Sequence, residues 1–459
     1  MASPCKNIMR PLALSLLLAL LATLTASAAD KPNILVIYLD DMGWGQPGCY
    51  GGKLAPTPHI DSIARNGVRF TDGYVAACIC SPSRVGLLTG RYQARTGHDA
   101  NSNEGKNPEN KNLLPSETTI AQRLKPLGYV TGIFGKWHVG ATSAEYLPAN
   151  RGFDEAFGTT GNLGDKMGFY KGKDFIPDPA GAPITSPIYA REAASFMERH
   201  RAEPWFLYVP FNAVHSPVVA SPEIKARFPD LPRAKQDYAA LISEADDAVG
   251  AILAKLRELK LEENTLVFLV SDNGGASPLA EMNGLRGRKW LLWEGGIRVT
   301  WLAQWKGRIP AGRVLETPVI QLDILPTALA AAGGTPQSEW KLDGTNLLPL
   351  LEGKADKLDR DTLYWRFGVQ YAVRQGDWKL VKAGLNQPVQ LFNLKEDRNE
   401  KDDLAAKQPE KVKSLQALWD AWNAGNLPPR WEDPRWNDGN NKNDPEAAKK
   451  KAAKKKAAK

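Results

Sequence analysis

Residues 33–39 read Asn-Ile-Leu-Val-Ile-Tyr-Leu, and Asp40 and Asp41 follow this almost continuous apolar run directly. Runs of this kind are typical of strands in a parallel sheet, because helices cover both faces of such a sheet. In open α/β sheets, ligand sites gather at the carboxyl ends of the strands. The segment therefore predicts a central strand that places two carboxylates at the functional edge of a sheet.

The same pattern recurs along the chain, separated by segments with helical periodicity. Buried strands are predicted at 129–135, 205–209 and 265–270, and polar residues follow the end of each. The longest predicted helix covers about 235–260, where apolar residues recur at helical spacing. Strands that alternate with helices predict an α/β fold, with a large mixed, mostly parallel sheet sandwiched by helices.

The character of the chain changes near residue 361. An amphipathic helix at about 409–424 follows four short predicted strands, at 363–366, 371–374, 378–381 and 390–393. This order predicts a small C-terminal α+β subdomain built on a short antiparallel sheet. We therefore expect one large domain at 30–360, which carries the polar residues at the strand ends, and a C-terminal subdomain at 361–430.

The two ends of the chain differ from the rest in composition. Residues 1–28 contain two basic residues, an apolar stretch at 12–24 and the tripeptide Ala26-Ser27-Ala28, which is the pattern of a secretory signal peptide. We therefore expect the export machinery to deliver the protein to the periplasm or the exterior, and we predict no transmembrane segment. Residues 437–459 are rich in Asn and Asp and then in Lys and Ala, which predicts a disordered tail.

The formal net charge of +8 is concentrated at these ends. Two basic residues of the signal segment and seven lysines of the tail account for the excess, and the rest of the chain is close to neutral. The near-neutral charge between the two ends therefore predicts that this part of the chain has no nucleic-acid-binding surface. For the tail, a solvated segment is favoured over one that binds polyanions.

Residues 80–91 read Cys-Ser-Pro-Ser-Arg-Val-Gly-Leu-Leu-Thr-Gly-Arg. Proline is tolerated in the first turn of a helix, and Thr89-Gly90 provides an end, so a short helix is predicted. Cys80 then lies at the helix N-terminus, where backbone N–H groups favour an anion, and Arg84 lies one turn further on the same face. Once Cys5 has left with the signal peptide, Cys49 and Cys78 remain either to pair or to stay reduced.

Four oxygen-bearing side chains follow two of the predicted strands: Asp40, Asp41, Asp272 and Asn273. Either pair alone is typical of a turn or a helix cap. Clustered carboxylates repel one another unless a cation lies between them, and ligation by oxygen alone suits Ca²⁺ or Mg²⁺ rather than Zn²⁺. The two pairs together predict a metal site.

The segment Gly128-Tyr-Val-Thr-Gly-Ile-Phe-Gly-Lys-Trp-His138 adds a cation and an imidazole. Lys136 and His138 are two residues apart, so on extended chain they point to the same side. With residues 80–91, this segment resembles the two signatures of the type I sulfatases, the formylglycine-dependent branch of the alkaline phosphatase superfamily, of arylsulfatase and N-acetylgalactosamine-6-sulfatase type. The resemblance covers roughly residues 31–425.

The resemblance implies a nucleophile and a metal. It implies that a formylglycine-generating maturation enzyme oxidises Cys80 to formylglycine, whose hydrate attacks sulfur. It also implies one Ca²⁺, with Mg²⁺ less favoured, held by the four oxygen side chains and by the group at Cys80. Arg84, Lys136 and Lys289 are expected to stabilise charge, His138 to hold or deprotonate a hydroxyl, and His215 or Lys289 to assist the departing alcohol.

Three further residues are weaker candidates for substrate contacts. His98 follows the first signature, and its alternative is an ordinary buried or surface histidine. Trp290 and Trp293 stand where the family often has small residues after Lys289, and they suit either stacking on a sugar or aromatic ring, or burial in the core.

The function predicted from the sequence is hydrolysis of a sulfuric ester, with a sulfated carbohydrate or an aryl sulfate as substrate. One alternative is a phosphatase or phosphonate hydrolase on the same scaffold, although two-metal phosphatases need more Asp and His ligands. The other is a catalytically silent carbohydrate-binding relative, and the complete residue set argues against it.

Overall fold

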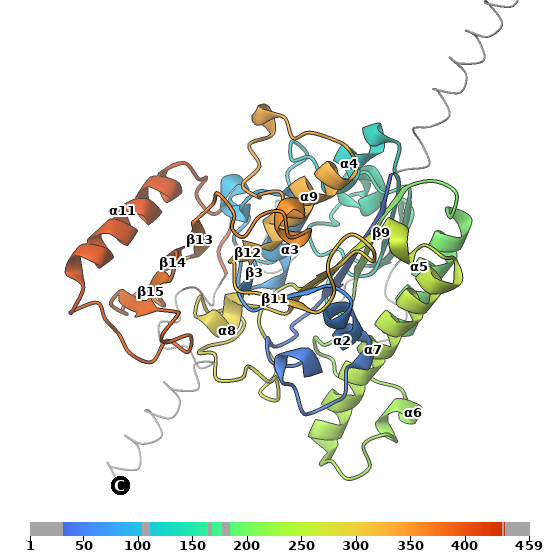
Figure 1. The fold of residues 1–459 in the computed structure, drawn as a ribbon, viewed down its shortest axis with the longest axis horizontal. Coiled ribbons are helices and arrows are strands. Elements are labelled where there is room, and N and C mark those ends of the chain that lie inside the picture. The colour runs from blue at the N-terminus through green and yellow to red at the C-terminus, as the bar shows by residue number, and fades with distance from the viewer. Residues whose placement is uncertain (1–30, 103–110, 164–167, 177–183, 434–435, 437–459) are drawn as a thin grey trace, which may run out of the picture.

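The computed structural model describes residues 31–102, 111–163, 168–176, 184–433 and 436 (Figure 1). The predicted signal peptide and the predicted disordered tail lie outside these residues. Within the described residues, no helix is both long and apolar enough to cross a membrane.

A ten-stranded sheet forms the centre of the fold, in the order β11-β2-β10-β9-β1-β8-β4-β5-β6-β7. Its middle five strands are parallel to one another. They are β9 (Thr265–Ser271), β1 (Asn33–Leu39), β8 (Trp205–Pro210), β4 (Val130–Phe134) and β5 (Glu155–Thr159). The strands predicted at 33–39, 129–135, 205–209 and 265–270 are therefore confirmed, and they are adjacent in the sheet.

Antiparallel pairing occurs toward both edges of this sheet. On one side β10 is antiparallel to β9 and to β2, and on the other side β6 and β7 continue the sheet from β5, each antiparallel to the strand before it. These strands are β2 (Val68–Phe70), β10 (Trp301–Gln304), β11 (Arg313–Leu315), β6 (Phe169–Lys171) and β7 (Asp174–Ile176). The sheet is thus mixed but mostly parallel at its centre. A separate pair joins β3 (Gly73–Tyr74) to β12 (Val319–Ile320).

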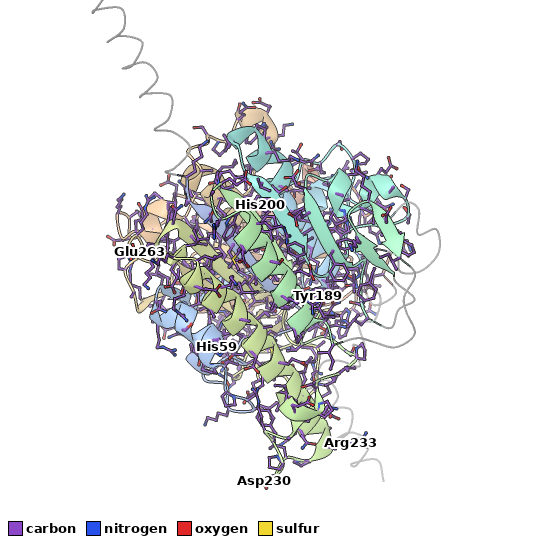
Figure 2. All side chains as sticks on the ribbon, turned by 90° about the vertical axis from the view of Figure 1, so that its right-hand side faces the viewer. His59, Tyr189, His200, Asp230, Arg233 and Glu263 are labelled. Carbon is purple, nitrogen blue, oxygen red and sulfur yellow. The ribbon has the colours of Figure 1, made fainter. Side chains whose placement is uncertain are left out.

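Alternate residues of β1 supply two hydrophobic cores, one on each face of the sheet. Leu35, Ile37 and Leu39 belong to the core beneath α5 (Ser186–Arg199) and α7 (Arg233–Glu258), which lie side by side on one face (Figure 2). Ile34, Val36 and Tyr38 belong to the core on the other face. Because successive side chains of a strand point to opposite faces, a fully apolar strand has to be covered twice.

The second face is covered by shorter helices, among them α3 (Cys80–Thr89), α4 (Ile120–Leu124) and α9 (Ile324–Ala331). The helix predicted after Cys80 is confirmed, and it ends where Gly90 adopts a left-handed φ of 66°. The other short helices are α2 (Pro58–Arg65), α6 (Pro222–Lys225), α8 (Glu294–Ile297) and α10 (Leu348–Leu351).

The predicted C-terminal antiparallel sheet is also present. It is a four-stranded meander in the order β13-β14-β15-β16, and α11 (Pro409–Ala424) packs against it (Figure 1). Its strands are β13 (Thr362–Phe367), β14 (Gln370–Gln375), β15 (Trp378–Lys382) and β16 (Gln390–Asn393).

A buried group of charges joins this small sheet to the main body. The Lys379 ammonium of β15 lies 2.8 Å from carboxylate oxygens of both Glu294 and Glu400, and all three side chains are completely buried. Glu294, the first residue of α8, also accepts from Arg298 at 2.6 Å and from the Tyr74 hydroxyl at 2.7 Å. The segment that contains α8 is thus bonded both to β15 of the small sheet and to Tyr74 of the main body.

This arrangement predicts that Lys379→Met is strongly destabilising. The substitution leaves two buried carboxylates without their shared cation, and breaking a buried ion pair costs about 3–5 kcal/mol. Urea denaturation followed by circular dichroism measures this cost. Lys382→Met, at the partly exposed end of the same strand, is the matched control. Equal stability of the two variants would contradict the role assigned to Lys379.

Candidate active site

The two predicted pairs of oxygen ligands meet because their strands are neighbours. In the parallel pair β1·β9, Leu39 is in register with Ser271, so Asp40 and Asp272 follow at the same level. The Asp272 amide donates to the Leu39 carbonyl at 2.8 Å, and the Asp41 amide donates to Asp272 Oδ1 at 3.2 Å. Asp41 has a φ of 61°, a left-handed conformation that is costly for a residue with a side chain and is concentrated at functional sites.

Cys80 lies opposite these carboxylates, at the first residue of α3. Its thiol donates to Asp40 Oδ1 at 3.4 Å, and the Lys289 ammonium donates to Cys80 Sγ at 3.1 Å. Burial raises the pKa of the Cys80 thiol, and the nearby Asp40 carboxylate raises it further. Cys80 is therefore protonated at neutral pH, and as a thiol it is a weak nucleophile.

Arg84 connects three parts of the site through one guanidinium. Its Nε and Nη2 donate to Asp272 Oδ2 at 3.2 and 2.8 Å, and its Nη1 donates to the Lys136 carbonyl at 2.8 Å. Burial raises the pKa of Asp272 to about 7, the neighbouring Asp40 adds to this rise, and Arg84 opposes it. Arg84 thus favours the ionised form of a carboxylate that burial would otherwise protonate.

Lys136 and His138 follow the end of β4, which is separated from β1 by β8. The Lys136 ammonium pairs with Asp40 Oδ2 and donates to Asn162 Oδ1, the latter at 2.6 Å. His138 is buried, and its Nδ1 has no hydrogen-bond partner among the described residues. Burial, together with the charge of Lys136, lowers the pKa of His138, so its imidazole is neutral.

His215 and Lys289 both approach Asp41. His215 Nε2 lies 3.6 Å from Asp41 Oδ2, and its Nδ1 donates to the Ser216 carbonyl at 2.5 Å. The Lys289 ammonium lies 2.7 Å from Asp41 Oδ1. Burial alone would lower the pKa of Lys289, but Asp41 and its other anionic neighbours raise it well above the usual value, so the side chain is charged.

Glycine keeps the segment around Lys289 tightly folded. A Cβ on Gly296 would lie 1.9 Å from the Leu291 carbonyl oxygen, a distance that no side chain permits. The turn can therefore close only with glycine at this position, and it holds Lys289 between α8 and the ends of the strands.

The three weaker candidates lie in different environments. His98 is buried behind the start of α3, where Nε2 bonds the Ser81 hydroxyl at 2.8 Å and the ring meets Trp431 edge-on. Trp293 is 2% exposed, with the Arg286 guanidinium 3.6 Å from the centre of its ring and Phe392 packed against it. Of the two interpretations for Trp293, the structure favours burial in the core.

Trp290 differs from Trp293 in exposure. It is half-buried, and Lys289 Nζ lies 5.3 Å from the centre of its ring. It therefore stays a candidate for a substrate contact.

Asn162 is a member of this group that sequence reasoning missed. It holds the Lys136 ammonium beside Asp40, and it is 9% exposed. It follows β5, a strand that was not predicted because Glu155–Thr159 is short and carries a charged residue. The feature that could have indicated Asn162 is its position three residues after the end of β5, at the same edge of the sheet as the other polar residues.

The carboxylate and amide oxygens at this edge of the sheet fit a hard cation. One ligand atom each of Asp40, Asp41, Cys80 and His215 lies within 4.8 Å of the others. Asn273 Oδ1 is buried without a hydrogen-bond partner among the described residues, while its Nδ2 donates to Asp41 Oδ1 at 2.7 Å. Oxygen ligands of this type suit Ca²⁺ or Mg²⁺. Asp272 stands outside the group of four, and Arg84 engages its carboxylate.

The site is that of a hydrolase for an anionic ester, with cations and neutral imidazoles around one buried residue at a helix N-terminus. The family model for sulfatases matches residues 32–334, and that for the C-terminal part of N-sulphoglucosamine sulphohydrolase matches residues 286–421. The chain belongs to the sulfatase family, in the alkaline phosphatase superfamily, and it is a sulfatase.

Curated relatives and solved structures agree with this assignment. The chain is 36% identical over 384 residues to N-acetylgalactosamine-6-sulfatase of Homo sapiens, covering 77% of this chain and 72% of that protein. It is 32% identical over 452 residues to steryl-sulfatase of Mus musculus, again covering 77% of this chain and 72% of that protein. The crystal structure of Ps i-CgsB in complex with k-i-k-neocarrahexaose is similar with a TM-score of 0.80 and 30% identity, covering 93% of this chain and 99% of that one.

The geometry predicts that Arg84→Lys impairs turnover severely. Lysine keeps the charge but cannot reproduce the fork that engages Asp272 and the Lys136 carbonyl together. We expect kcat for 4-nitrophenyl sulfate to fall roughly 10²-fold, as it does when one preorganised donor is removed from an active site. Arg91→Lys is the matched control, since Arg91 pairs with Glu117 through two 2.8 Å bonds outside the site. A similar kcat for both variants would contradict the role of Arg84.

Proposed function

We propose that this sulfatase hydrolyses the sulfate ester of a sulfated carbohydrate, with a formylglycine made from Cys80 as nucleophile and one bound Ca²⁺. The observation that carries the proposal is the environment of Cys80, a protonated thiol held between the Asp40 carboxylate and the Lys289 ammonium. A thiol with a raised pKa is a poor attacking group. Formylglycine would supply instead a hydrate with two hydroxyls on one carbon.

The cation would be held by Asp40, Asp41, Asp272 and Asn273, together with the group at position 80. When bound, Ca²⁺ supplies positive charge at the sulfate oxygens and at the nucleophile. Asn273 supports this assignment most directly, because its Oδ1 is a buried acceptor with no hydrogen-bond partner among the described residues. His215 Nε2 lies 3.6 Å from Asp41 Oδ2 and belongs to the same group of ligand atoms, but we assign it to the departing alcohol rather than to the cation.

The remaining residues would act through charge and proton transfer. Lys136 and Lys289 place two ammonium groups beside Asp40 and Asp41, where they would stabilise negative charge on a sulfuryl group. His138 is neutral, and its Nδ1 has no hydrogen-bond partner among the described residues, so it would hold a hydroxyl of the nucleophile through a hydrogen bond. His215 or Lys289 would protonate the departing alcohol oxygen. Arg84 would favour the ionised form of Asp272 and hold Lys136 in place.

A carbohydrate is favoured over a simple aryl sulfate as the natural substrate. N-acetylgalactosamine-6-sulfatase is named for a sugar, and the crystal structure of Ps i-CgsB contains a neocarrahexaose. The predicted signal peptide supports a periplasmic or secreted enzyme that meets such polymers outside the cell. A maturation enzyme that converts Cys80 would be a required partner.

The requirement for two hydroxyls predicts different behaviour of Cys80→Ser and Cys80→Ala. The serine Oγ can attack sulfur while the bond from sulfur to the alcohol oxygen breaks, which leaves a sulfate ester on the protein. The serine Cβ carries no second hydroxyl that could expel the sulfate, so we expect at most one turnover. Cys80→Ala should retain no sulfate.

Incubation with 4-nitrophenyl sulfate, followed by mass spectrometry of the peptide that contains position 80, measures this outcome. In the wild-type protein, made together with a maturation enzyme, the same peptide should contain the aldehyde. Repeated turnover by Cys80→Ser near the wild-type rate would exclude the proposed nucleophile.

The proposed metal site predicts that Asn273→Ala weakens calcium binding. The change removes a neutral oxygen ligand without altering the balance of charges among Asp40, Asp41 and Asp272. We expect affinity to fall roughly tenfold or more, because even supporting residues of metal sites contribute 10–100-fold. Calorimetric titration with Ca²⁺, after a chelator has removed bound metal from the protein, measures this effect. The control is Asp230→Ala, at an exposed position near the start of α7 (Figure 2). Unchanged affinity would remove Asn273 from the site.

A further inference from the structure

A groove of about 470 Å³ lies between two segments that are far apart in the sequence. One wall is formed by residues from Gly275 to Arg288, and the other by Gln390 and residues 399–401 of the C-terminal part. The lining includes three cations, Arg286, Arg288 and Lys401. Pro278 and Met282 add apolar surface to the lining.

One wall of this groove is continuous with the segment that carries Lys289 of the candidate active site. Gly275 lines the groove, and its carbonyl accepts a hydrogen bond from the Lys289 amide at 3.2 Å. Arg288 lines the groove, whereas the next residue, Lys289, reaches Cys80 Sγ at 3.1 Å. Consecutive Cα atoms are only about 3.8 Å apart. The segment that contains Arg288 and Lys289 therefore contributes to both the groove and the candidate active site.

The groove has an excess of positive charge. Among the described residues that line it, Glu400 is the one carboxylate, and that carboxylate pairs with Lys379 at 2.8 Å and accepts from the Glu294 amide at 2.6 Å. Within the part of the chain that the structure describes, neither Arg288 nor Lys401 has a carboxylate within ion-pair distance. Their charges are therefore available to a ligand.

Unpartnered polar atoms in the same lining also indicate a ligand. Arg286 Nε and Asn399 Oδ1 are buried without hydrogen-bond partners among the described residues, while Arg286 Nη1 donates to the Glu400 carbonyl at 3.0 Å. Buried polar groups are normally satisfied, so each exception needs an explanation. A hydroxylated, anionic ligand offers acceptors to Arg286 and a donor to Asn399.

We propose that this groove binds a second anionic group of an extended sulfated oligosaccharide whose scissile sulfate lies at Cys80. The inference rests on the proposed function and extends it, because it makes the enzyme selective for glycans with more than one anion. Arginine suits such a group, since its planar fork binds sulfate or carboxylate oxygens in pairs. Both anions share this chemistry.

The test compares Arg288→Gln and Lys401→Gln, alone and combined, in full-length Cys80→Ala protein. The control is Arg233→Gln, whose side chain is 95% exposed at the start of α7 (Figure 2). The probes are hexasaccharides of ι-carrageenan and of chondroitin 6-sulfate, each with a matching monosaccharide that carries one anion, galactose 4-sulfate and N-acetylgalactosamine 6-sulfate. Isothermal titration gives the affinities, and thermal unfolding confirms that each variant is folded.

For the hexasaccharide that binds more tightly, we expect each single variant to lose roughly tenfold in affinity, as for a charge-assisted hydrogen bond. The loss for the matching monosaccharide should be clearly smaller, because it has no second anion, and the control variant should lose no affinity. Carrageenan carries sulfates alone, so a length-dependent loss with its hexasaccharide shows that sulfate suffices as the second anion. Equal losses for both lengths, no loss, or no binding of any probe would overturn the proposal.

A separate assay distinguishes this proposal from the proposed function. Wild-type turnover of 4-nitrophenyl sulfate tests the reaction at Cys80 and does not need the groove. If the wild type turns over this ester but the groove variants bind every probe as the parent does, the groove proposal fails and the function stands. If the wild type, made together with a maturation enzyme, releases sulfate neither from this ester nor from any of the saccharide probes, while the variants still separate the two lengths, the groove stands and the proposed reaction fails.

Discussion

The structure depends on the mutual compensation of three buried carboxylates and three buried cations. Asp40, Asp41 and Asp272 are each at most 3% exposed, and so are Arg84, Lys136 and Lys289. An uncompensated charge in the protein interior is very unfavourable. Each strand or helix that carries one of these six side chains therefore has to be in place for the others to be stable. The same groups make a centre that is suited to an anionic transition state, because their orientation is fixed before the substrate binds.

The sheet brings these groups together, and its register sets their level. Asp40 and Asp272 meet because β1 and β9 are parallel neighbours, and Lys136 arrives at the same edge because only β8 separates β4 from β1. The apolar strands are covered on both faces, which leaves the carboxyl edge as the place where polar side chains can gather. The position of Cys80 at the start of α3 then adds the oriented N–H groups of a helix end to the same place.

The C-terminal sheet contributes through the segment that carries Lys289. Glu294 begins α8 and is anchored by Lys379 from β15 and by Arg298 from the end of its own turn. Trp293 is buried against Phe392 of β16, so the segment has both a polar and an apolar attachment to the small sheet. The groove lined by Arg288 and Lys401 lies along this junction, so the C-terminal part both supports the site and forms a wall beside it.

The sequence by itself determined the central strands, the main helices and most of the residue types of the site. The apolar runs before Asp40 and Asp272, the helix from Cys80 and the final helix at 409–424 were all predictable, because periodicity and capping act over a few residues. Only the tertiary structure decided that Arg84 engages Asp272, that Asn162 holds Lys136, and that Trp293 is core. The two hydrogen-bonded contacts join residues 188 and 26 positions apart, and Trp293 packs against a strand of another sheet. No local pattern encodes such a pairing, because it depends on how the strands are ordered in space.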